Sequence, residues 1–199
     1  MKKIFMTLMS VVTIFLMAAC GNSDAAQNST NPSAHNETPT QSKILVAFFS
    51  ATGNTAELAE NISKAIGADL YEIKAKDEYT SRDLDWHNEN SRTTIEMRED
   101  NENVRPEIDG TVENFDGYET IIVAYPIWWN TEPRIIDTFL ESYDFKGKTV
   151  IPVCTSGGSD IQQSESHMKK ICPAATWKNG QRFNSRTTQD ELKNWFSKL

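Results

Sequence analysis

The sequence predicts an α/β fold in which a doubly wound, five-stranded parallel sheet lies between two layers of helices. Apolar runs of strand length recur along the chain and are nearly continuous, as in parallel strands that are buried on both faces. Segments whose apolar residues repeat at helical spacing alternate with these runs. Strands and helices that alternate in this way form a three-layer α/β/α domain with the sheet at its centre.

The strands are expected where the apolar runs occur. They cover residues 43–49, 70–73, 120–124, 148–154 and 175–177. The fourth of them contains Pro152, which has no N–H group to donate to a neighbouring strand. One edge of that strand should therefore be unpaired at this residue.

Helices are expected between the strands and after the last one. The first should end at Gly67, because glycine readily adopts the left-handed conformation that terminates helices. The second should be capped by Thr131, with Pro133 in its first turn. A third should follow residue 159, and the last should begin with a capping box formed by Thr188 and Glu191.

The connection between the second and third strands, residues 74–117, is long and acidic. A helix is expected within it, from about Trp86 to Asp100. The connection is longer than one helical crossover needs, so it could form a cap that shapes access to a site. The alternative is a solvated connection with no such role.

The N-terminus has the features of a bacterial export signal. Lys2 and Lys3 precede an apolar run over residues 4–17, which is too short for a membrane span and suits the core of a signal peptide. Two alanines then lead into Cys20, and this string resembles the bacterial lipobox, in which the cysteine is acylated and becomes the mature N-terminus.

One position departs from the lipobox pattern. The usual leucine lies three residues before the cysteine, where this chain has Met17, and Leu16 is one place early. The alternative interpretation is an ordinary secretory leader that is cleaved near Ala19.

These patterns divide the chain into three segments. Residues 1–19 are expected to be a signal peptide, and residues 20–41 a lipidated cysteine with a flexible tether. The tether contains small and polar residues with no aromatic or large aliphatic side chain, so it cannot bury enough apolar area to fold. Residues 42–199 are expected to form one domain on the outer face of the bacterial plasma membrane, held there by the lipid.

The charge of the chain excludes some partners. The net charge is −8, and it becomes −10 when the two lysines of the leader are removed. A domain of this charge is a poor nucleic-acid binder because phosphates repel it. It is also repelled by anionic lipids, so it needs an anchor to stay at a membrane.

The first predicted strand leads into a loop that suits an anion. Ser50, Thr52, Asn54 and Thr55 have side chains that can donate hydrogen bonds, and Gly53 allows a tight turn that exposes backbone N–H groups. Such a loop at a helix N-terminus is a natural phosphate site. It has no lysine, so it is not a P-loop, and it has no GxGxxG dinucleotide fingerprint. The alternative is a polar turn that only caps the helix.

The string Ser-Ala-Thr-Gly-Asn-Thr resembles the phosphate loop of the flavodoxin family, S/T-x-T-G-x-T. The strings Y-P-I-W-W and C-T-S-G-G-S after the third and fourth strands also resemble that family, in which these two loops hold the isoalloxazine ring. The resemblance covers residues 43–199 and implies FMN as the cofactor. The FMN-binding residues that it implies are Ser50, Ala51, Thr52, Gly53, Asn54, Thr55, Pro126, Ile127, Trp128, Trp129, Asn130, Thr155, Ser156, Gly157 and Gly158.

The residue types in the second and third loops are consistent with a flat ligand. Trp128 and Trp129 offer stacking surfaces, and at least one of them is expected to be a core residue because adjacent indoles cannot easily face one ligand. Gly157 and Gly158 would let backbone N–H groups approach the polar edge of a ring.

Other chemistry has little support. His87 and His167 have no cysteine or acidic partner at metal-ligand spacing, so no metal site is expected. Cys154 and Cys172 could be free thiols or a bridge, but neither belongs to a C-x-x-C motif. No Ser-His-Asp arrangement is evident, and no catalytic residue is predicted.

Three functions remain. The first is a membrane-tethered electron carrier with FMN as its redox group, supplied by a redox partner protein or the quinone pool. The second is an FMN-dependent reductase of a small molecule such as a quinone. The third is a non-redox binding lipoprotein on the same scaffold. The chain offers no second domain for nicotinamide, which favours the carrier.

Overall fold

The computed structural model describes residues 43–98 and 101–199. The expected signal peptide, the lipidated Cys20 and the tether lie outside these residues. Within the described part of the chain, no helix is both long enough and apolar enough to cross a membrane.

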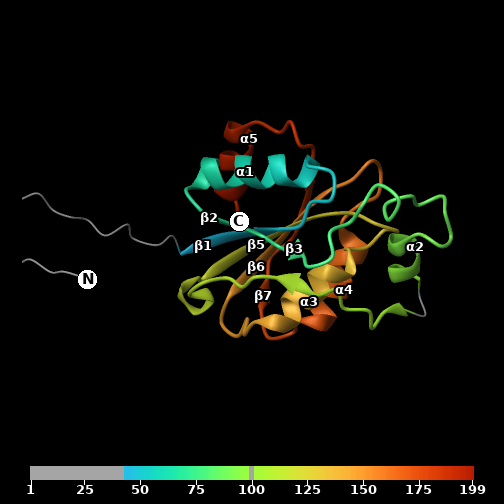
Figure 1. Ribbon diagram of the computed structural model, residues 1–199. Coiled ribbons are helices and arrows are strands. Elements are labelled where there is room, and N and C mark those ends of the chain that lie inside the picture. Colours follow the sequence, from blue (N-terminus) through green and yellow to red (C-terminus); the bar gives the residue numbers. More distant parts are fainter. Residues whose placement is uncertain (1–42, 99–100) are drawn as a thin grey trace, which may run out of the picture. The chain divides into compact units, whose positions relative to one another are not determined.

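The centre of the domain is a parallel sheet with the strand order β2-β1-β5-β6-β7, and β8 also pairs with β6 (Figure 1). The strands are β1 (Ile44–Phe48), β2 (Asp69–Glu72), β5 (Thr120–Pro126), β6 (Thr149–Thr155), β7 (Thr176–Trp177) and β8 (Gln181–Phe183). Strand β1 pairs with β2 on one side and with β5 on the other, so the order in which strands are added to the sheet reverses between β1 and β5. The loops that follow these two strands lie at the carboxyl edge of the sheet. Ligands of open parallel sheets bind at such switch points.

The doubly wound parallel sheet is confirmed, and its fifth position is divided between two short strands. Strand β7 pairs with the first part of β6, where Val150 is opposite Trp177, and β8 pairs with the last part, from Val153 onward. Pro152 lies between these two stretches and pairs only with β5. The missing N–H of Pro152 therefore falls where this edge is unpaired, as the sequence predicts.

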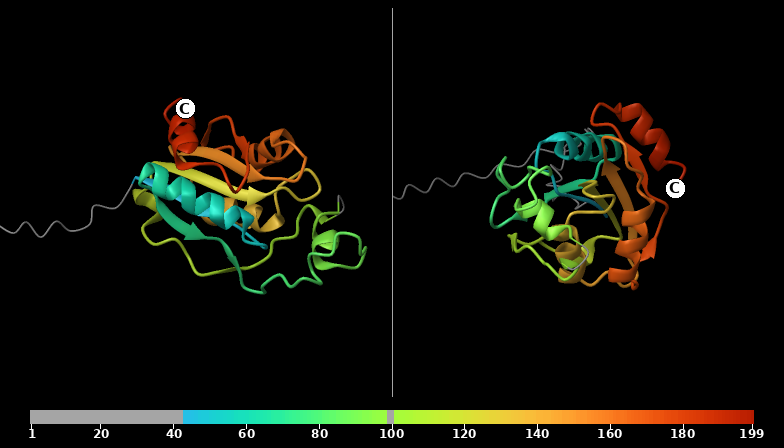
Figure 2. Two further views of the ribbon diagram at one scale, coloured as in Figure 1. Left: turned by 90° about the horizontal axis from the view of Figure 1, so that it is seen from above. Right: turned by 90° about the vertical axis from the view of Figure 1, so that its right-hand side faces the viewer.

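Helices cover both faces of the sheet (Figures 1 and 2). The longer helices of the described residues are α1 (Asn54–Ile66), α3 (Arg134–Ser142), α4 (Gln162–Ile171) and α5 (Gln189–Phe196). One core cluster includes Leu58 of α1 and Leu192 of α5, and the other includes Phe139 of α3 and Met168 of α4. Successive residues of β1 contribute to opposite clusters, because side chains alternate along a strand. The three-layer α/β/α arrangement is thus confirmed.

The ends of most helices follow their sequence signals. Helix α1 ends at Gly67, which has a φ of 68°, and the capping box of α5 is present between Thr188 and Glu191. Helix α3 differs from the expectation, since it begins at Arg134 and Thr131 does not cap it. The hydroxyl of Thr131 donates to Glu132 instead. Pro133 is itself in an extended conformation, with a ψ of 142°, so it precedes the helix instead of lying in its first turn.

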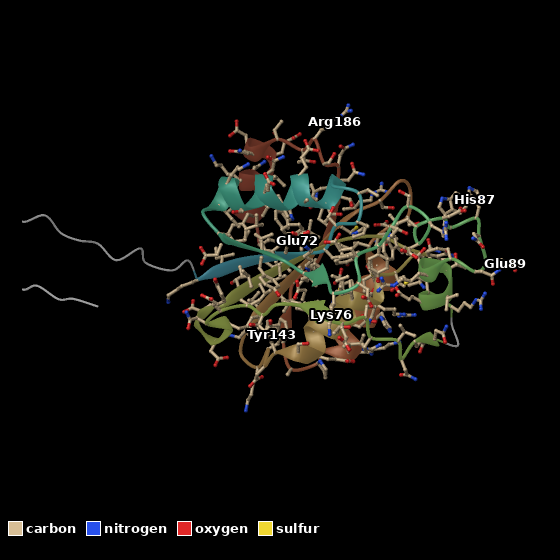
Figure 3. All side chains as sticks on the ribbon, viewed as in Figure 1. Glu72, Lys76, His87, Glu89, Tyr143 and Arg186 are labelled. Carbon is tan, nitrogen blue, oxygen red and sulfur yellow. The ribbon has the colours of Figure 1, made fainter. Side chains whose placement is uncertain are left out.

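The long connection contains little regular structure. It includes a short antiparallel pair, β3 (Lys74–Ala75) and β4 (Ile108–Asp109), the short helix α2 (Arg92–Glu96) and the 3-10 turn η2 (Phe115–Gly117). The expected helix from Trp86 to Asp100 is wrong over its described part, because only α2 is helical there. His87 and Glu89 point outward from this connection into solvent (Figure 3).

Candidate functional site

The loop from Ser50 to Thr55 joins β1 to α1 at the carboxyl edge of the sheet. Gly53 precedes the helix with a φ of 90°, which an L side chain rarely adopts. Its N–H donates to the Ser50 hydroxyl over 3.1 Å, and the Asn54 amide donates to the Thr52 hydroxyl over 3.3 Å. Both hydroxyls accept in these bonds, so each keeps its own hydrogen to donate to a ligand.

The first turn of α1 adds backbone donors to this loop. The N–H groups of Asn54, Thr55 and Ala56 have no acceptor within the helix, because the first residues of a helix lack a preceding turn. They lie at the positive end of the helix dipole. Hydroxyls and N–H groups at this place favour an anion that is held by hydrogen bonds.

The second loop makes a tight turn from Trp128 to Thr131. Each of these two residues donates its N–H to the carbonyl of the other, over 2.9 and 3.0 Å. The central residues, Trp129 and Asn130, have φ values of 46° and 65°. A turn with two positive φ angles suits Asn and Gly, whereas a bulky tryptophan is strained there. Backbone strain of this kind is common at ligand sites.

The two tryptophans of this loop have different environments. Trp128 is half-buried, and its ring packs edge-on against Phe49 and Tyr79 at centroid distances of 5.5 and 5.4 Å. Trp129 is 41% exposed. Trp128 thus packs against the core, whereas Trp129 presents its indole to solvent at the same loop.

The third loop begins at the end of β6 and contacts the other two. The Thr155 hydroxyl is 2.8 Å from the Thr55 hydroxyl. The Ser159 hydroxyl donates to the side-chain oxygen of Asn130 over 2.7 Å. Arg182 donates to the carbonyl of Gly158 over 2.7 Å. These contacts hold the three loops together at one edge of the sheet.

The three loops line one pocket of about 740 Å³. The predicted residues that line it are Ala51, Thr52, Asn54, Thr55, Pro126, Ile127, Trp128, Trp129, Thr155, Ser156 and Gly157. Ser50, Gly53, Asn130 and Gly158 belong to the same loops but do not line the pocket. None of the described residues in its lining is charged.

Other lining residues were not predicted individually. Leu84, Trp86 and Thr93 come from the long connection, Phe183 ends β8, and Asn184 and Ser185 follow it. Trp86 is 65% exposed, and its ring contacts that of His87 with centroids 3.5 Å apart and planes tilted by 34°. The only sequence signal was the length of the connection. Its position at the pocket favours the cap over the solvated alternative.

Polar contacts fix the connection beside the pocket. The Glu96 carboxylate accepts hydrogen bonds from the Tyr79 hydroxyl over 2.7 Å and from Nε of Arg92 over 2.6 Å. The Arg92 guanidinium also lies 3.9 Å from the centre of the Tyr79 ring. Burial, and then the nearby charge of Glu96, raise the pKa of Tyr79. Tyr79 therefore stays protonated, and it links the cap to Trp128.

The two cysteines of the domain do not form a bridge. Cys154 and Cys172 are both free and buried, which decides between the alternatives left by the sequence. Burial raises the pKa of the Cys154 thiol to about 12. A thiol in this state is a poor nucleophile, so it is a packing residue rather than a redox group.

Residues 43–199 match the family model described as flavodoxin. The chain belongs to the flavodoxin family. The family assignment confirms the resemblance to flavodoxins that the sequence indicates over residues 43–199. No match was found among curated proteins.

Solved structures with similar folds include two from Bacteroides. A protein from Bacteroides eggerthii assigned as a flavoprotein is 46% identical, with a TM-score of 0.74 over 78% of this chain and 96% of that chain. One from Bacteroides uniformis is 41% identical, with a TM-score of 0.74 over 79% and 99% of the two chains. A flavoprotein from Lactobacillus acidophilus, solved in complex with FMN, is 22% identical with a TM-score of 0.60 over 77% and 97%.

Proposed function

We propose that this flavodoxin-family domain binds one FMN in the 740 Å³ pocket and transfers electrons through it. The observation that carries the proposal is that the loops after β1, β5 and β6 line a single pocket at the switch point of the sheet. The Lactobacillus acidophilus flavoprotein, which shares this fold, was solved in complex with FMN.

The residues present fit the phosphate of FMN. Thr52 in the pocket lining and Ser50 in the same loop keep hydroxyl hydrogens to donate, and the first turn of α1 has N–H groups without helical acceptors. None of the described residues that line the pocket is basic, so a phosphate monoester would be held by hydrogen bonds and the helix dipole rather than by an ion pair.

The residues present also fit a flat ring. Trp129 is an exposed indole in the pocket lining, and Gly157 leaves its backbone accessible. FMN supplies the ability to accept and release one or two electrons. The chain's own contribution is to orient the ring between the second and third loops and to restrict its contact with water. The long connection between β2 and β5 restricts water through Leu84, Trp86 and Thr93, which line the pocket.

An electron carrier is the leading form of this function, with a redox partner protein or the quinone pool as the source of electrons. The second form is an FMN-dependent reductase of a small molecule such as a quinone. Trp86 and Trp129 favour it, because two exposed indoles in one pocket lining offer surface for a second flat molecule. Steady turnover with a nicotinamide donor and a quinone acceptor would identify the reductase.

We also propose that Cys20 carries a lipid and anchors the domain on the outer face of the plasma membrane. The export signal before Cys20 and the polar composition of residues 21–41 support this location. Replacing Cys20 by Ser should release the domain from membranes or leave the precursor unprocessed. An unmodified Cys20 in membrane-bound protein, found by mass spectrometry, would contradict the anchor.

The absorbance spectrum of the freshly purified full chain tests the central claim. A yellow protein with about one FMN per chain is expected, because the three loops are already joined by hydrogen bonds. A well-folded protein that is colourless and takes up no added FMN would overturn the claim. It would leave the non-redox binding lipoprotein as the alternative.

A further inference from the structure

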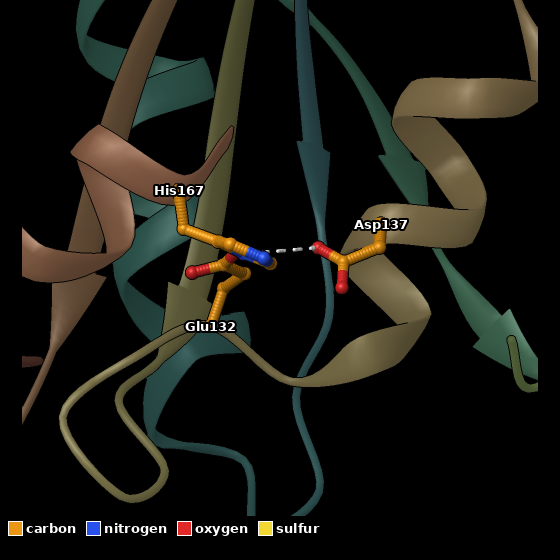
Figure 4. A group of neighbouring side chains, drawn as sticks. All are labelled: Glu132, Asp137 and His167. Atoms are coloured by element: carbon orange, nitrogen blue, oxygen red, sulfur yellow. Dashed lines mark hydrogen bonds and ion pairs between the residues drawn. The ribbon is translucent and has the colours of Figure 1, made fainter. Parts of the chain in front are cut away.

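A second group of polar residues lies between α3 and α4, outside the pocket lining. Glu132 precedes α3, Asp137 belongs to its first turn, and His167 lies on α4. Figure 4 shows their side chains pointing toward one another from these three places. The side chains of Glu132 and Asp137 are fully buried, and that of His167 is 25% exposed. Sequence spacing does not reveal this group, because the fold brings residue 167 to residues 132 and 137.

Each carboxylate has one oxygen held by a donor or a cation and one directed at the middle of the group. Oε2 of Glu132 accepts the Thr131 hydroxyl, whereas its Oε1 contacts Nδ1 of His167. Oδ2 of Asp137 is 3.5 Å from the Arg134 guanidinium and 3.8 Å from that of Arg105. Its Oδ1 is 4.0 Å from Nδ1 of His167.

Asp137 is the unusual member of the group. It is fully buried, and neither of its oxygens accepts a hydrogen bond from a described residue. Its burial, and then the charge of Glu132, raise its pKa to about 8. A buried carboxylate without donors is unfavourable unless it gains a proton or a cation.

We propose that Oε1 of Glu132, Oδ1 of Asp137 and Nδ1 of His167 bind one divalent transition-metal ion such as Zn²⁺. The three ligand atoms lie within 4.8 Å of one another. Zinc bonds of about 2.0–2.2 Å place tetrahedral ligands about 3.4 Å apart. Small side-chain rotations therefore suffice, and a water molecule takes the fourth position. The imidazole favours a transition metal over Mg²⁺ or Ca²⁺, which prefer oxygen ligands.

The surroundings match those of known metal sites. Ligand carboxylates are normally hydrogen-bonded or ion-paired through their second oxygen, as Thr131 and Arg134 do here. The charge of Arg105 is already balanced by Glu141, which it contacts over 2.7 Å. Once Asp137 and His167 give up their protons to a binding ion, Glu132, Asp137 and Arg134 leave one excess negative charge in a buried place, and this charge holds the cation.

The partly exposed His167 gives an ion a path from solvent. None of the three ligands lines the 740 Å³ pocket. Zinc binding therefore does not depend on the proposed FMN site and can be measured in protein without flavin. The competing arrangement is an internal ion pair between His167 and Glu132 with no metal.

The test uses the full chain, without an affinity tag of histidines, after treatment with a chelator. Calorimetric titration with Zn²⁺ should show one ion bound per chain and a higher melting temperature. His167→Gln should weaken this binding at least tenfold, since it removes a direct ligand. His87→Gln is the matched control, because His87 is exposed and does not belong to the group, and it should leave zinc affinity unchanged.

Glu132→Gln and Asp137→Asn should weaken zinc binding in the same way. If either variant fails to fold, visible absorption by Co²⁺ added to the unaltered chain reports coordination directly, and a chelator should abolish it. The proposal is overturned if the unaltered chain binds no Zn²⁺, which leaves the internal ion pair, or if His167→Gln binds it as tightly as the unaltered chain.

Discussion

The hydroxyl groups of Thr55 and Thr155 are 2.8 Å apart and buried, although a hundred residues separate them in the chain. Thr55 lies in the first turn of α1 and Thr155 ends β6, so this bond joins two of the loops that line the pocket. One hydroxyl donates to the other, and the accepting one keeps a hydrogen that it can donate to a ligand. The pair thus both fixes the pocket and supplies a donor to it.

Thr55→Val should lower the free energy of unfolding by about 1–3 kcal/mol, because it leaves the buried Thr155 hydroxyl without its partner. The double variant Thr55→Val and Thr155→Val should lose less than the sum of the two single variants, since both partners are then removed together. Urea unfolding of the four proteins measures the coupling. Strictly additive losses would show that the hydroxyls do not interact.

Thr52→Ala should weaken FMN binding about ten- to hundredfold, because a hydrogen bond to a charged acceptor contributes about 1.5–3 kcal/mol. Riboflavin, which has no phosphate, should bind much more weakly than FMN and should be insensitive to this change. Fluorescence titration with both flavins measures the difference. Thr176→Ala is the control, since Thr176 is exposed on β7 and does not line the pocket. Equal affinity for riboflavin and FMN would exclude a phosphate site at Ser50–Thr55.

The parts of the fold that the sequence predicted depend on short-range signals. The strands are continuous apolar runs, Gly67 ends α1, and the capping box starts α5, so each element is specified by residues a few positions apart. The pocket loops were predictable for a related reason. Parallel strands place their carboxyl ends at one edge of the sheet, so loops after β1, β5 and β6 must meet there.

The connection was mispredicted because local side chains compete with the helix. The carboxylate of Asp85 and the amide oxygen of Asn88 accept backbone N–H groups two residues further on. These bonds form turns where helical hydrogen bonds would otherwise occur. Ser91 then caps α2, so the helix begins six residues later than predicted. The role of Trp86 in the pocket depends on this tertiary arrangement, and periodicity carries no information about it.

Cys154 should be almost inert to iodoacetamide in the folded protein. Its pKa of about 12 means that about one thiol in ten thousand is ionised at pH 8, and the side chain is also buried. Burial disfavours the thiolate, so the rate of labelling should rise only as the pH approaches 12. Mass spectrometry with and without denaturant should show labelling that follows unfolding. Rapid labelling of the native protein at pH 8 would contradict the packing role.

Trp128→Ala should destabilise the domain by about 3 kcal/mol, as truncation of a packed aromatic residue does. The ring contacts Phe49 and Tyr79, and through Tyr79 it contacts the network that holds the cap. Thermal and urea unfolding of the protein without flavin measure the loss. A change smaller than about 0.5 kcal/mol, the range of ordinary surface substitutions, would show that this indole is not part of the core.

Trp129→Asn should have the opposite effect on stability. The backbone of Trp129 has a φ of 46°, which asparagine adopts more readily than tryptophan, so the variant should gain about 1 kcal/mol in unfolding free energy. The indole of Trp129 is exposed, so its removal should cost little packing energy. Such a gain would indicate that the strain is retained for a ligand rather than for folding.

The Trp129→Asn variant should also change the redox potential of the bound flavin. Reduced flavin can be an anion, and an apolar aromatic wall disfavours that anion more than water does. Removing the indole should therefore make the redox potential less negative as well as weaken FMN binding. Dye-coupled reductive titration of Trp129→Asn and Trp128→Ala separates the two tryptophans, because only the one that contacts the ring should shift the potential. If neither variant shifts it, the ring stacks elsewhere in the pocket, and Trp86 is the remaining indole in its lining.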